Sequence, residues 1–467
     1  MDAKLPQVSV AQQLAGRIAG LRAERLPPAV RAKCVDLLID VAGLCVTARN
    51  EDYVKAALAG LDDDGPCTAI GHARTLSSAG AAFVNGTAAH GEDFDDTFEG
   101  GPVHAGAVVV PAVLAACERA PSLTLPRLRG REGWGPAALI GIAVGCEVMC
   151  RLSTVVPKAV HKAGFHPTAV FGVMGAAAGV SAALGLTQKQ IVDALGIAGS
   201  MAGGIIEYLA EGAWTKRLHP GWAAQSAIRA ALLARAGFNG PRTVFEGVHG
   251  LFHGFAHTAA GNYGALDDFG ERWVIETLAF KPYPCGTMAH PYIDCARRLA
   301  ARGIKPEAVK ELVCEVAEGT VHRLWEPLAA KQRPPNGYAA KFATPFILAT
   351  GFVRGGVGLD AFTDEAVRDP AVLALAAKVR YVIDPDNPYP NTFTGHIRAV
   401  LNDGSVVEER QPHFRGGAQE PLTHADIEEK FMLNVRHGGW DEGRGAAALR
   451  LLTRLYDGKI DLKDLRA

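Results

Sequence analysis

Helical periodicity runs through the first 266 residues and constrains the fold more than any other feature. Apolar residues recur there at three- and four-residue intervals, without the alternation typical of a half-buried strand. Pro121–Trp134, rich in Pro, Arg and Gly, breaks the pattern, and we expect an exposed connection there, while Cys67–His72 fits a short extended piece. We therefore predict a large all-helical domain over residues 1–266. Its expected helices are Val8–Ala23, Pro28–Arg49, Glu51–Leu61, Leu76–Thr97, Val108–Glu118, Pro136–Ser153, Thr168–Leu184, Thr187–Ala202 and Pro220–Ala236.

The pattern changes after residue 266. Short β-rich runs appear among helical stretches, and Asn402-Asp403-Gly404 has the composition of a hairpin turn. We predict a smaller α+β domain over residues 267–410, followed by C-terminal helices over 411–467 that return to the helical domain, so the fold class is mainly α. The expected strands are Leu312–Val316, Val379–Ile383, Gly395–Leu401 and Ser405–Arg410, and the expected helices are Pro291–Arg302, Lys341–Arg354, Ala371–Ala377, Thr423–Val435 and Gly445–Leu455.

The charge balance argues against two classes of partner. The chain carries 48 Lys and Arg against 49 Asp and Glu, a formal net charge of −1, so we expect neither a nucleic-acid nor a membrane-surface partner. The first ten residues have no apolar signal core, and the uncharged run Val170–Leu186 is just short of a spanning length, so we predict a buried helix there. Nine scattered cysteines indicate buried thiols in a reducing, cytoplasmic environment.

One polar stretch, His90–His104 (H-G-E-D-F-D-D-T-F-E-G-G-P-V-H), lies between apolar, Ala-rich flanks. Polar groups in such surroundings must be solvated by one another or by a ligand. If the preceding helix continues to Thr97, one face of it carries a carboxylate, an imidazole, a hydroxyl and a glycine that allows close approach. That face would hold Gly86, His90, Asp93 and Thr97, with His104 folding back after a Gly-Gly-Pro break and Glu92, Asp95, Asp96 and Glu99 pointing elsewhere.

A second candidate site is Lys216-Arg217-Leu218-His219-Pro220. If the helix begins at Pro220, the cationic and imidazole side chains lie beside its free N–H groups, an arrangement suited to a carboxylate or phosphate. The alternative is an ordinary solvated basic turn. The sequence leaves both open.

Three further motifs contain chemistry-bearing residues. His166 in Gly164-Phe165-His166-Pro167-Thr168 precedes a Gly/Ala-rich helix, and it is either a site residue or a core histidine bonded to backbone. His290 ends a Pro-rich loop that begins at Lys281, where it is either a site residue or a helix cap. Tyr338 in Tyr-Ala-Ala-Lys-Phe belongs either to a loop that closes over a ligand or to an ordinary helix start.

Several common signatures are absent from the sequence, which has no P-loop, no G-x-G-x-x-G after a strand and no G-x-S-x-G elbow. The run H-x-x-D-x-D-D offers possible metal ligands. A metal-dependent hydrolase built on His90, Asp93, Asp95 and Asp96 is therefore one alternative, although we expect no metal.

Taken in order, these stretches resemble the MmgE/PrpD family, which includes 2-methylcitrate dehydratase, cis-aconitate decarboxylase and iminodisuccinate epimerase. The resemblance covers nearly the whole chain. It implies a helical domain with an α+β lid domain, a homodimer, a site without a cofactor, and small di- or tricarboxylate substrates. Its most specific motifs are D-F-D-D-T at 93–97, G-F-H-P-T at 164–168, T-K-R-L-H-P-G-W-A-A at 215–224, K-P-Y-P-C at 281–285 and Y-A-A-K-F at 338–342. The site residues it implies are Asp93, Thr97, His104, His166, Lys216, His290 and Tyr338.

The reactions of this family share proton movement at a carbon next to a carboxylate, so cations must stabilise the negative charge that develops. We expect Lys216 to do so, helped by Arg217 or His219, and His166 or His104 to act as the base. The remaining expected roles are an imidazole-orienting carboxylate (Asp93), a second acid (His290 or Tyr338) and substrate contacts (Thr97, Lys281).

The predicted function is a lyase, either a dehydratase or a decarboxylase, acting on a small polycarboxylate. An epimerase of an aminopolycarboxylate is the first alternative, because acid and base groups on opposite faces of a carbon serve either outcome. A non-catalytic carboxylate-binding protein that keeps the same site is a further alternative.

Overall fold

The computed structural model describes residues 8–119, 134–390, 392–458 and 461–467, so most of the expected connection at 121–134 lies outside the described residues. It divides into two compact units. We call them the helical unit (residues up to Gly91, Asp95–Leu278 and Thr423–Ala467) and the mixed unit (Glu92–Phe94 and Ala279–Leu422). The fold is mainly α with a small sheet in the mixed unit, as predicted.

The helical unit is built from helices of up to 21 residues. Local signals fix several of their starts. Ser9, Thr187 and Thr423 each accept a hydrogen bond from the third helical residue in a capping box. The helices are α1 (Val10–Gly20), α2 (Pro28–Ala48), α3 (Asp52–Ala59), α4 (Ser78–Gly91), α5 (Ala105–Arg119), α6 (Gly135–Val155), α7 (Ala159–Lys162), α8 (Pro167–Ala183), α9 (Gln188–Met201), α10 (Tyr208–Glu211), α11 (Thr215–Arg235), α12 (Leu251–Ala256), α19 (His424–His437) and α20 (Glu442–Thr453).

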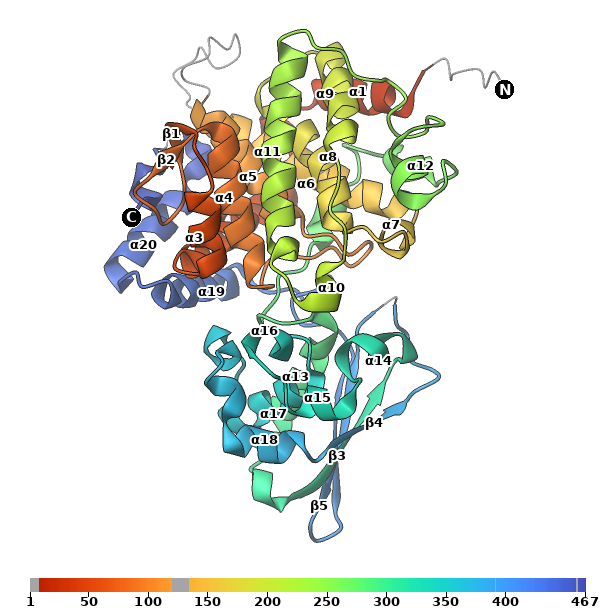
Figure 1. Ribbon diagram of the computed structural model, residues 1–467, viewed down its shortest axis with the longest axis vertical. Helices are drawn as coiled ribbons and strands as arrows, with labels where there is room; N and C mark the ends of the chain where they lie inside the picture. Colours follow the sequence, from red (N-terminus) through yellow and green to blue (C-terminus); the bar gives the residue numbers. More distant parts are fainter. Residues whose placement is uncertain (1–7, 120–133, 391, 459–460) are drawn as a thin grey trace. The chain divides into compact units, whose positions relative to one another are not determined.

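Close backbone approach organises the centre of this unit. A Cβ atom at Gly175 or Gly179 of α8 would come within 2.6 Å of a carbonyl oxygen of α6, so only glycine fits at these crossings. Helix α11 packs against α4, α8 and α9 and lies across the unit in Figure 1. Helix α6 is apolar and long enough to span a membrane by length and composition, but 89% of its most apolar window is buried inside the fold, as expected of a core helix.

The prediction of an all-helical first domain is wrong over residues 64–76, where only the extended piece expected at Cys67–His72 pointed towards a strand. A short strand pair, β1 (Asp64–Thr68) and β2 (Thr75–Leu76), interrupts the helices and pairs antiparallel. The strands are too short to produce a visible alternation of apolar and polar residues, so no periodic signal marks them.

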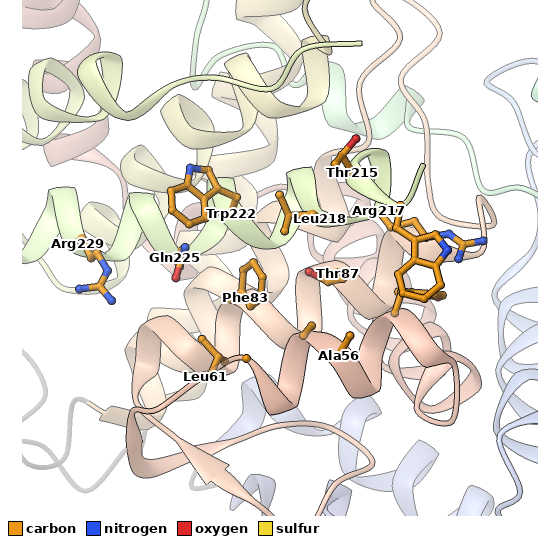
Figure 2. Close-up of a pocket in the computed structure, with 14 residues that line it drawn as sticks. Ala56, Leu61, Phe83, Thr87, Thr215, Arg217, Leu218, Trp222, Gln225 and Arg229 are labelled. Atoms are coloured by element: carbon orange, nitrogen blue, oxygen red, sulfur yellow. The ribbon is translucent and has the colours of Figure 1, made fainter. Parts of the chain in front are cut away.

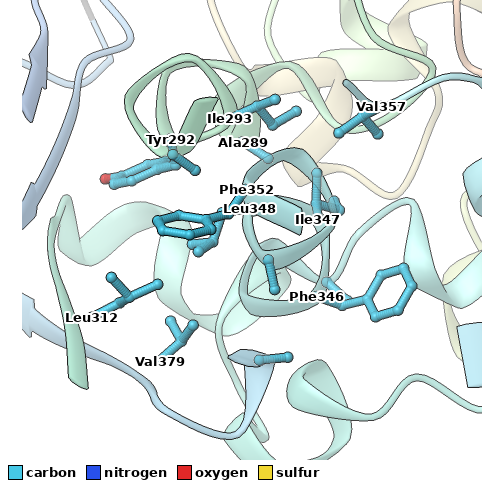
Figure 3. Packing of buried hydrophobic residues seen from close by; sticks show 14 of the residues in the cluster. Ala289, Tyr292, Ile293, Leu312, Phe346, Ile347, Leu348, Phe352, Val357 and Val379 are labelled. Atoms are coloured by element: carbon cyan, nitrogen blue, oxygen red, sulfur yellow. The ribbon is translucent and has the colours of Figure 1, made fainter. Parts of the chain in front are cut away.

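The mixed unit contains a four-stranded sheet in the order β4-β3-β5-β6, in which β3 and β4 are parallel and the other pairs antiparallel. Helices α13 and α17 pack on each other and α13 packs on the sheet, and Figure 3 shows Ile293, Leu312 and Phe346 in the shared core. The elements are β3 (Val309–Val316), β4 (Val379–Ile383), β5 (Gly395–Leu401), β6 (Val406–Gln411), α13 (His290–Ala301), α14 (Glu318–Leu324), α15 (Leu328–Gln332), α16 (Gly337–Ala340), α17 (Thr344–Arg354) and α18 (Pro370–Ala376).

The observed division between the units lies about a dozen residues beyond each boundary expected at 267 and 410. Residues up to Leu278 stay with the helical unit because Glu147 of α6 accepts the N–H groups of Val274 and Ile275, each at 3.0 Å. Residues after β6 stay with the mixed unit, where the Phe280 N–H donates to the Gly416 carbonyl over 3.0 Å.

Candidate active site

Helix α4 ends at Gly91, so the prediction of a helix through Thr97 is wrong. A Cβ atom at position 91 would lie 2.1 Å from the Tyr53 hydroxyl, and Asp93 adopts a left-handed φ of 56°. The expected face of Gly86, His90, Asp93 and Thr97 therefore does not form. The close neighbour of Gly86 is the backbone of α11, because a Cβ atom there would be 2.8 Å from the Gly221 Cα.

The turn after Gly91 brings Asp95 back against His90. Both side chains are completely buried, and the His90 Nδ1 lies 2.7 Å from the Asp95 Oδ2. The other oxygen of Asp95 is 3.5 Å from the Nδ1 of His104. The prediction that Asp95 points away from this face is wrong, and one carboxylate instead serves two imidazoles. Gly91 at the end of a helical run was the sequence signal for this turn.

Backbone contacts hold His104 at the start of α5. Its Nδ1 donates to the Asp96 carbonyl over 2.7 Å, and its N–H donates to the Thr168 hydroxyl over 3.3 Å. The Asp96 carboxylate caps α5 by accepting the N–H groups of Ala105 and Gly106, each at 2.9 Å. Burial, followed by the nearby Asp95, raises the pKa of Asp96 to about 7. Asp96 is thus a structural cap of the helix that begins beside His104.

His166 and His219 form a second imidazole pair, with 3.0 Å between their Nδ1 atoms. The His166 N–H donates to the Gly204 carbonyl over 2.8 Å, which fixes the ring at the start of α8. Burial is the main cause that lowers the pKa of His166 well below its usual value, and burial likewise lowers the pKa of His219 to about 4. Both rings are therefore neutral at pH 7.

The two imidazole pairs belong to one cluster. The His90 ring centroid lies 4.8 Å from that of His104 and 5.7 Å from that of His166. Tyr208 of α10 packs edge-on against His166 and His219, with centroid distances of 6.1 and 5.8 Å. We call His90, His104, His166, His219 and Asp95 the imidazole cluster. No local pattern pointed to Tyr208.

Helix α11 begins at Thr215, five residues before the predicted start, and Pro220 lies inside it. Lys216 is therefore the second residue of the helix and lies in its first turn, which carries the free N–H groups. Its positive charge contributes to the lowered pKa of His219 after burial and His90, and to that of His166 after burial, His90 and His219. The charge of Lys216 therefore acts on two rings of the imidazole cluster.

Arg217 lies in a different environment. Its guanidinium stacks over the Tyr53 ring, 4.3 Å from the centroid, and it lines a groove of about 630 Å³ between α11 and the pair α3 and α4. Figure 2 shows this groove, with Arg217, Leu218 and Trp222 on the α11 side. Arg217 and His219 are two residues apart on the same helix, but only His219 belongs to the imidazole cluster.

A second charged cluster lies in the mixed unit. The buried Lys281 ammonium contacts the Asp93 carboxylate at 2.8 Å and the Asp93 carbonyl at 2.9 Å. Lys341 makes the same pair of contacts with Glu92, at 2.8 and 2.7 Å. We call these four residues the ion-pair cluster. The predicted substrate residue Lys281 and the predicted site residue Asp93 are thus bonded to each other.

His290 lies near this cluster, completely buried between Tyr283 and Phe414. Its Nε2 donates to the Cys285 carbonyl over 3.2 Å, and its buried Nδ1 has no hydrogen-bond partner among the residues described. Burial, followed by Lys281, lowers the pKa of His290 to about 3. The ring is therefore neutral at pH 7.

The last two predicted site residues have less defined surroundings. Tyr338 is half-buried in α16 and packs edge-on against Phe342, with 5.7 Å between centroids. Thr97 is buried in the segment between α4 and α5. These surroundings assign neither residue a chemical role.

The metal-ligand set predicted for the hydrolase is not brought together. Asp93 is paired with Lys281 and Asp96 caps α5, which leaves His90 and Asp95 of the expected four. With His104 these two offer ligand atoms within 4.8 Å of one another. Three such ligands fit a divalent metal in principle, but the Nδ1 atoms of both histidines already face oxygen acceptors.

Two family models match the chain. Residues 12–262 match the MmgE/PrpD N-terminal domain and residues 283–449 match the MmgE/PrpD C-terminal domain. Among curated proteins, the chain is 28% identical over 447 residues to cis-aconitate decarboxylase of Mus musculus, covering 91% of this chain and 87% of the relative. It is 30% identical over 372 residues to the Homo sapiens cis-aconitate decarboxylase (77% and 73% covered), and 26% identical over 441 residues to that of Aspergillus terreus (88% and 86% covered).

Proposed function

The chain belongs to the MmgE/PrpD family, and from this premise we propose that it is a carboxy-lyase that removes CO2 from cis-aconitate or a closely related tricarboxylate without a cofactor. Relatives with the name cis-aconitate decarboxylase, aligned over most of both chains, support a lyase acting on an aconitate-like acid. The observation that carries the proposal is the imidazole cluster with Lys216 beside it.

Decarboxylation places two demands on a protein. The C–C bond to the departing carboxylate breaks, its electron pair stays on carbon and spreads into the adjacent unsaturated acid, and a proton must then reach carbon. Fixed cations stabilise the developing charge, and a positioned acid delivers the proton. A polycarboxylate supplies further negative charge that the same cations can bind.

The helical unit contains groups suited to both demands. We assign charge stabilisation to the Lys216 ammonium, which is electrostatically coupled to His166 and His219. We assign proton delivery to His104, whose partner Asp95 can balance the charge that the ring acquires with a proton. The neutral His166 and His219 accept or donate hydrogen bonds and bind substrate oxygens. No step of the reaction is assigned to the other residues that the sequence predicts in the site, which are Thr97, Asp93, Lys281, His290, Tyr338 and Arg217.

One experiment compares the candidate reactions. The protein is incubated in D2O with cis-aconitate, citrate, 2-methylcitrate or iminodisuccinate and followed by proton NMR. We expect cis-aconitate to lose CO2 and the product to carry one deuteron on the carbon that receives the proton. Elimination from a citrate, or inversion of iminodisuccinate with deuterium uptake and no loss of CO2, would replace the proposal by a dehydratase or an epimerase.

The same samples test the hydrolase and the binding protein. Stoichiometric divalent metal in the purified protein, with activity lost on chelation, would favour the hydrolase built on His90 and Asp95. Tight binding of the acids without turnover or deuterium exchange would favour a binding protein. We expect activity that survives chelation.

We also propose that the protein is a cytoplasmic homodimer. Trp214, just before α11, and Leu218 and Trp222 within it are 52%, 37% and 51% exposed, and at four-residue spacing they form an apolar stripe along the groove. Small residues of α3 (Ala56, Ala57 and Gly60) line the opposite wall, so ridge and recess on one copy match recess and ridge on another. Light scattering should give twice the 49.2 kDa chain mass, and Trp222→Glu should give the monomer mass.

A further inference from the structure

Asp95 is the carboxylate of the imidazole cluster. Its side chain is completely buried, with one oxygen 2.7 Å from the His90 Nδ1 and the other 3.5 Å from the His104 Nδ1. A buried carboxylate is costly unless charge or hydrogen bonds compensate it. His90 provides one such hydrogen bond, and the His104 ring lies near the other oxygen, where it can compensate the carboxylate when it carries a proton.

This arrangement fixes which ring nitrogen carries the proton. The Asp95 carboxylate and the Asp96 carbonyl only accept hydrogen bonds, so the Nδ1 atoms of His90 and His104 both donate. The Nε2 of each neutral ring is then the nitrogen left to accept a proton. In His90 this Nε2 is buried and has no hydrogen-bond partner in the part of the chain described. The centroid of the His90 ring lies 5.7 Å from that of His166.

The neighbouring charges distinguish Asp95 from the buried carboxylates around it. After burial, Asp95 contributes to the raised pKa of two other buried carboxylates, Asp96 and Asp40. Asp96 is used as the cap of α5, and Asp40 of α2 is paired with Lys430 of α19 at 2.7 Å. Of these three described carboxylates, Asp95 is the one that directs its charge at the imidazoles.

We propose that Asp95 is a positioning residue that fixes the tautomer of His90 and balances the charge His104 acquires during proton transfer. This inference rests on the proposed acid–base function. It gives to Asp95 the role that sequence reasoning assigned to Asp93. Asp95 acts through the two rings and needs no contact with substrate.

Two isosteric substitutions in adjacent residues test the proposal. Asp95→Asn removes the charge and can donate to His90, which favours the wrong tautomer. We expect kcat to fall about 100-fold or more, KM to change less than about threefold, and the pH profile of kcat/KM to move. In the matched control, Asp96→Asn, we expect kcat within about threefold of wild type and an unmoved profile, because its neutral form is already populated near pH 7. A folded Asp95→Asn protein with wild-type kcat and pH profile, or equal losses in both variants, would overturn the proposal.

A measurement on the wild-type protein covers the case in which Asp95→Asn does not fold. In protein with 15N-labelled histidine, imidazole nitrogen shifts report which nitrogen is protonated. We expect neutral His90 and His104 to carry the proton on Nδ1, and a proton on the His90 Nε2 alone would overturn the inference. This result does not depend on turnover, so a wild-type protein inactive on every acid would end the proposed function and leave the tautomer assignment standing.

Discussion

The two clusters of buried polar groups differ in how their charges are balanced. In the imidazole cluster of the helical unit, four rings gather with one carboxylate, and two of the rings are neutral at pH 7. In the ion-pair cluster of the mixed unit, each ammonium has its own carboxylate and the backbone carbonyl of the same residue. Buried polar groups thus serve two purposes in this protein. Matched ion pairs hold a conformation, whereas neutral rings around one charge can take up and release protons.

Removing a ring of the imidazole cluster, or the ammonium beside it, should have the largest effect on activity. We expect His166→Ala and Lys216→Ala each to lower kcat/KM about 100- to 10,000-fold, because His166 binds substrate oxygens beside the proton-delivering His104 and Lys216 stabilises the developing charge. Initial rates of CO2 release measure the effect, and circular dichroism checks the fold. Near wild-type rates in both variants would remove the imidazole cluster from the mechanism.

A substitution in the ion-pair cluster should instead lower the free energy of unfolding. Lys281→Met leaves the Asp93 carboxylate buried without its ammonium, and we expect a loss of about 3–5 kcal/mol in the free energy of unfolding. Urea denaturation measures it. Adding Asp93→Asn in the same chain should recover much of the loss, since the unpaired charge is then gone and Asn tolerates the left-handed φ at this position. A single variant that loses less than about 1 kcal/mol would show that this pair does not fix the conformation.

The pH dependence of stability sharpens the contrast. The pKa of His166 and of His219 lies below the ordinary value of 6.5, so below that pH the unfolded chain binds more protons and stability falls as pH falls towards 4. Asp96, with its pKa near 7 against 3.8, acts in the opposite direction and loses stabilisation as pH rises from about 4 to 7. The slope of the denaturation midpoint against pH, between pH 4 and 7, should therefore be smaller in His219→Asn and larger in Asp96→Asn than in the wild-type protein. Unchanged slopes in both would contradict these shifts.

The smallest effect on activity is expected at Arg217, and it tests whether this residue lies outside the imidazole cluster. Arg217 stacks on Tyr53 in the groove, whereas His219 on the same helix bonds to His166. We expect Arg217→Ala to change kcat/KM less than about threefold and His219→Ala to lower it at least about tenfold. The two rates are measured side by side on the same substrate. A larger loss in Arg217→Ala would bring this residue into the site, as sequence reasoning predicted.

Local signals in the sequence were enough to predict much of the fold. The boundaries of β4 and β5 were predicted to the residue, and α9 begins one residue after its expected start. Boundaries failed where tertiary contacts decide them. Helix α4 stops against Tyr53, a residue of α3, and α11 begins five residues before the proline that best fitted a helix start.

The candidate site shows the same limit. The sequence identified histidines in the right motifs, but their partners are distant in the chain. Thr168 positions the His104 backbone from 64 residues away, and Lys281 reaches Asp93 across 188 residues. Such pairings depend on how helices pack, so no local pattern could separate Asp93 from Asp95.

The tripeptide Glu92–Phe94 has a consequence for how this protein could be divided or recombined. A gene fragment encoding only residues 279–422 would omit both acids that neutralise Lys281 and Lys341. The excised product would carry two stranded ammonium groups in its interior, so transplanting this module requires the distant tripeptide to be grafted with it.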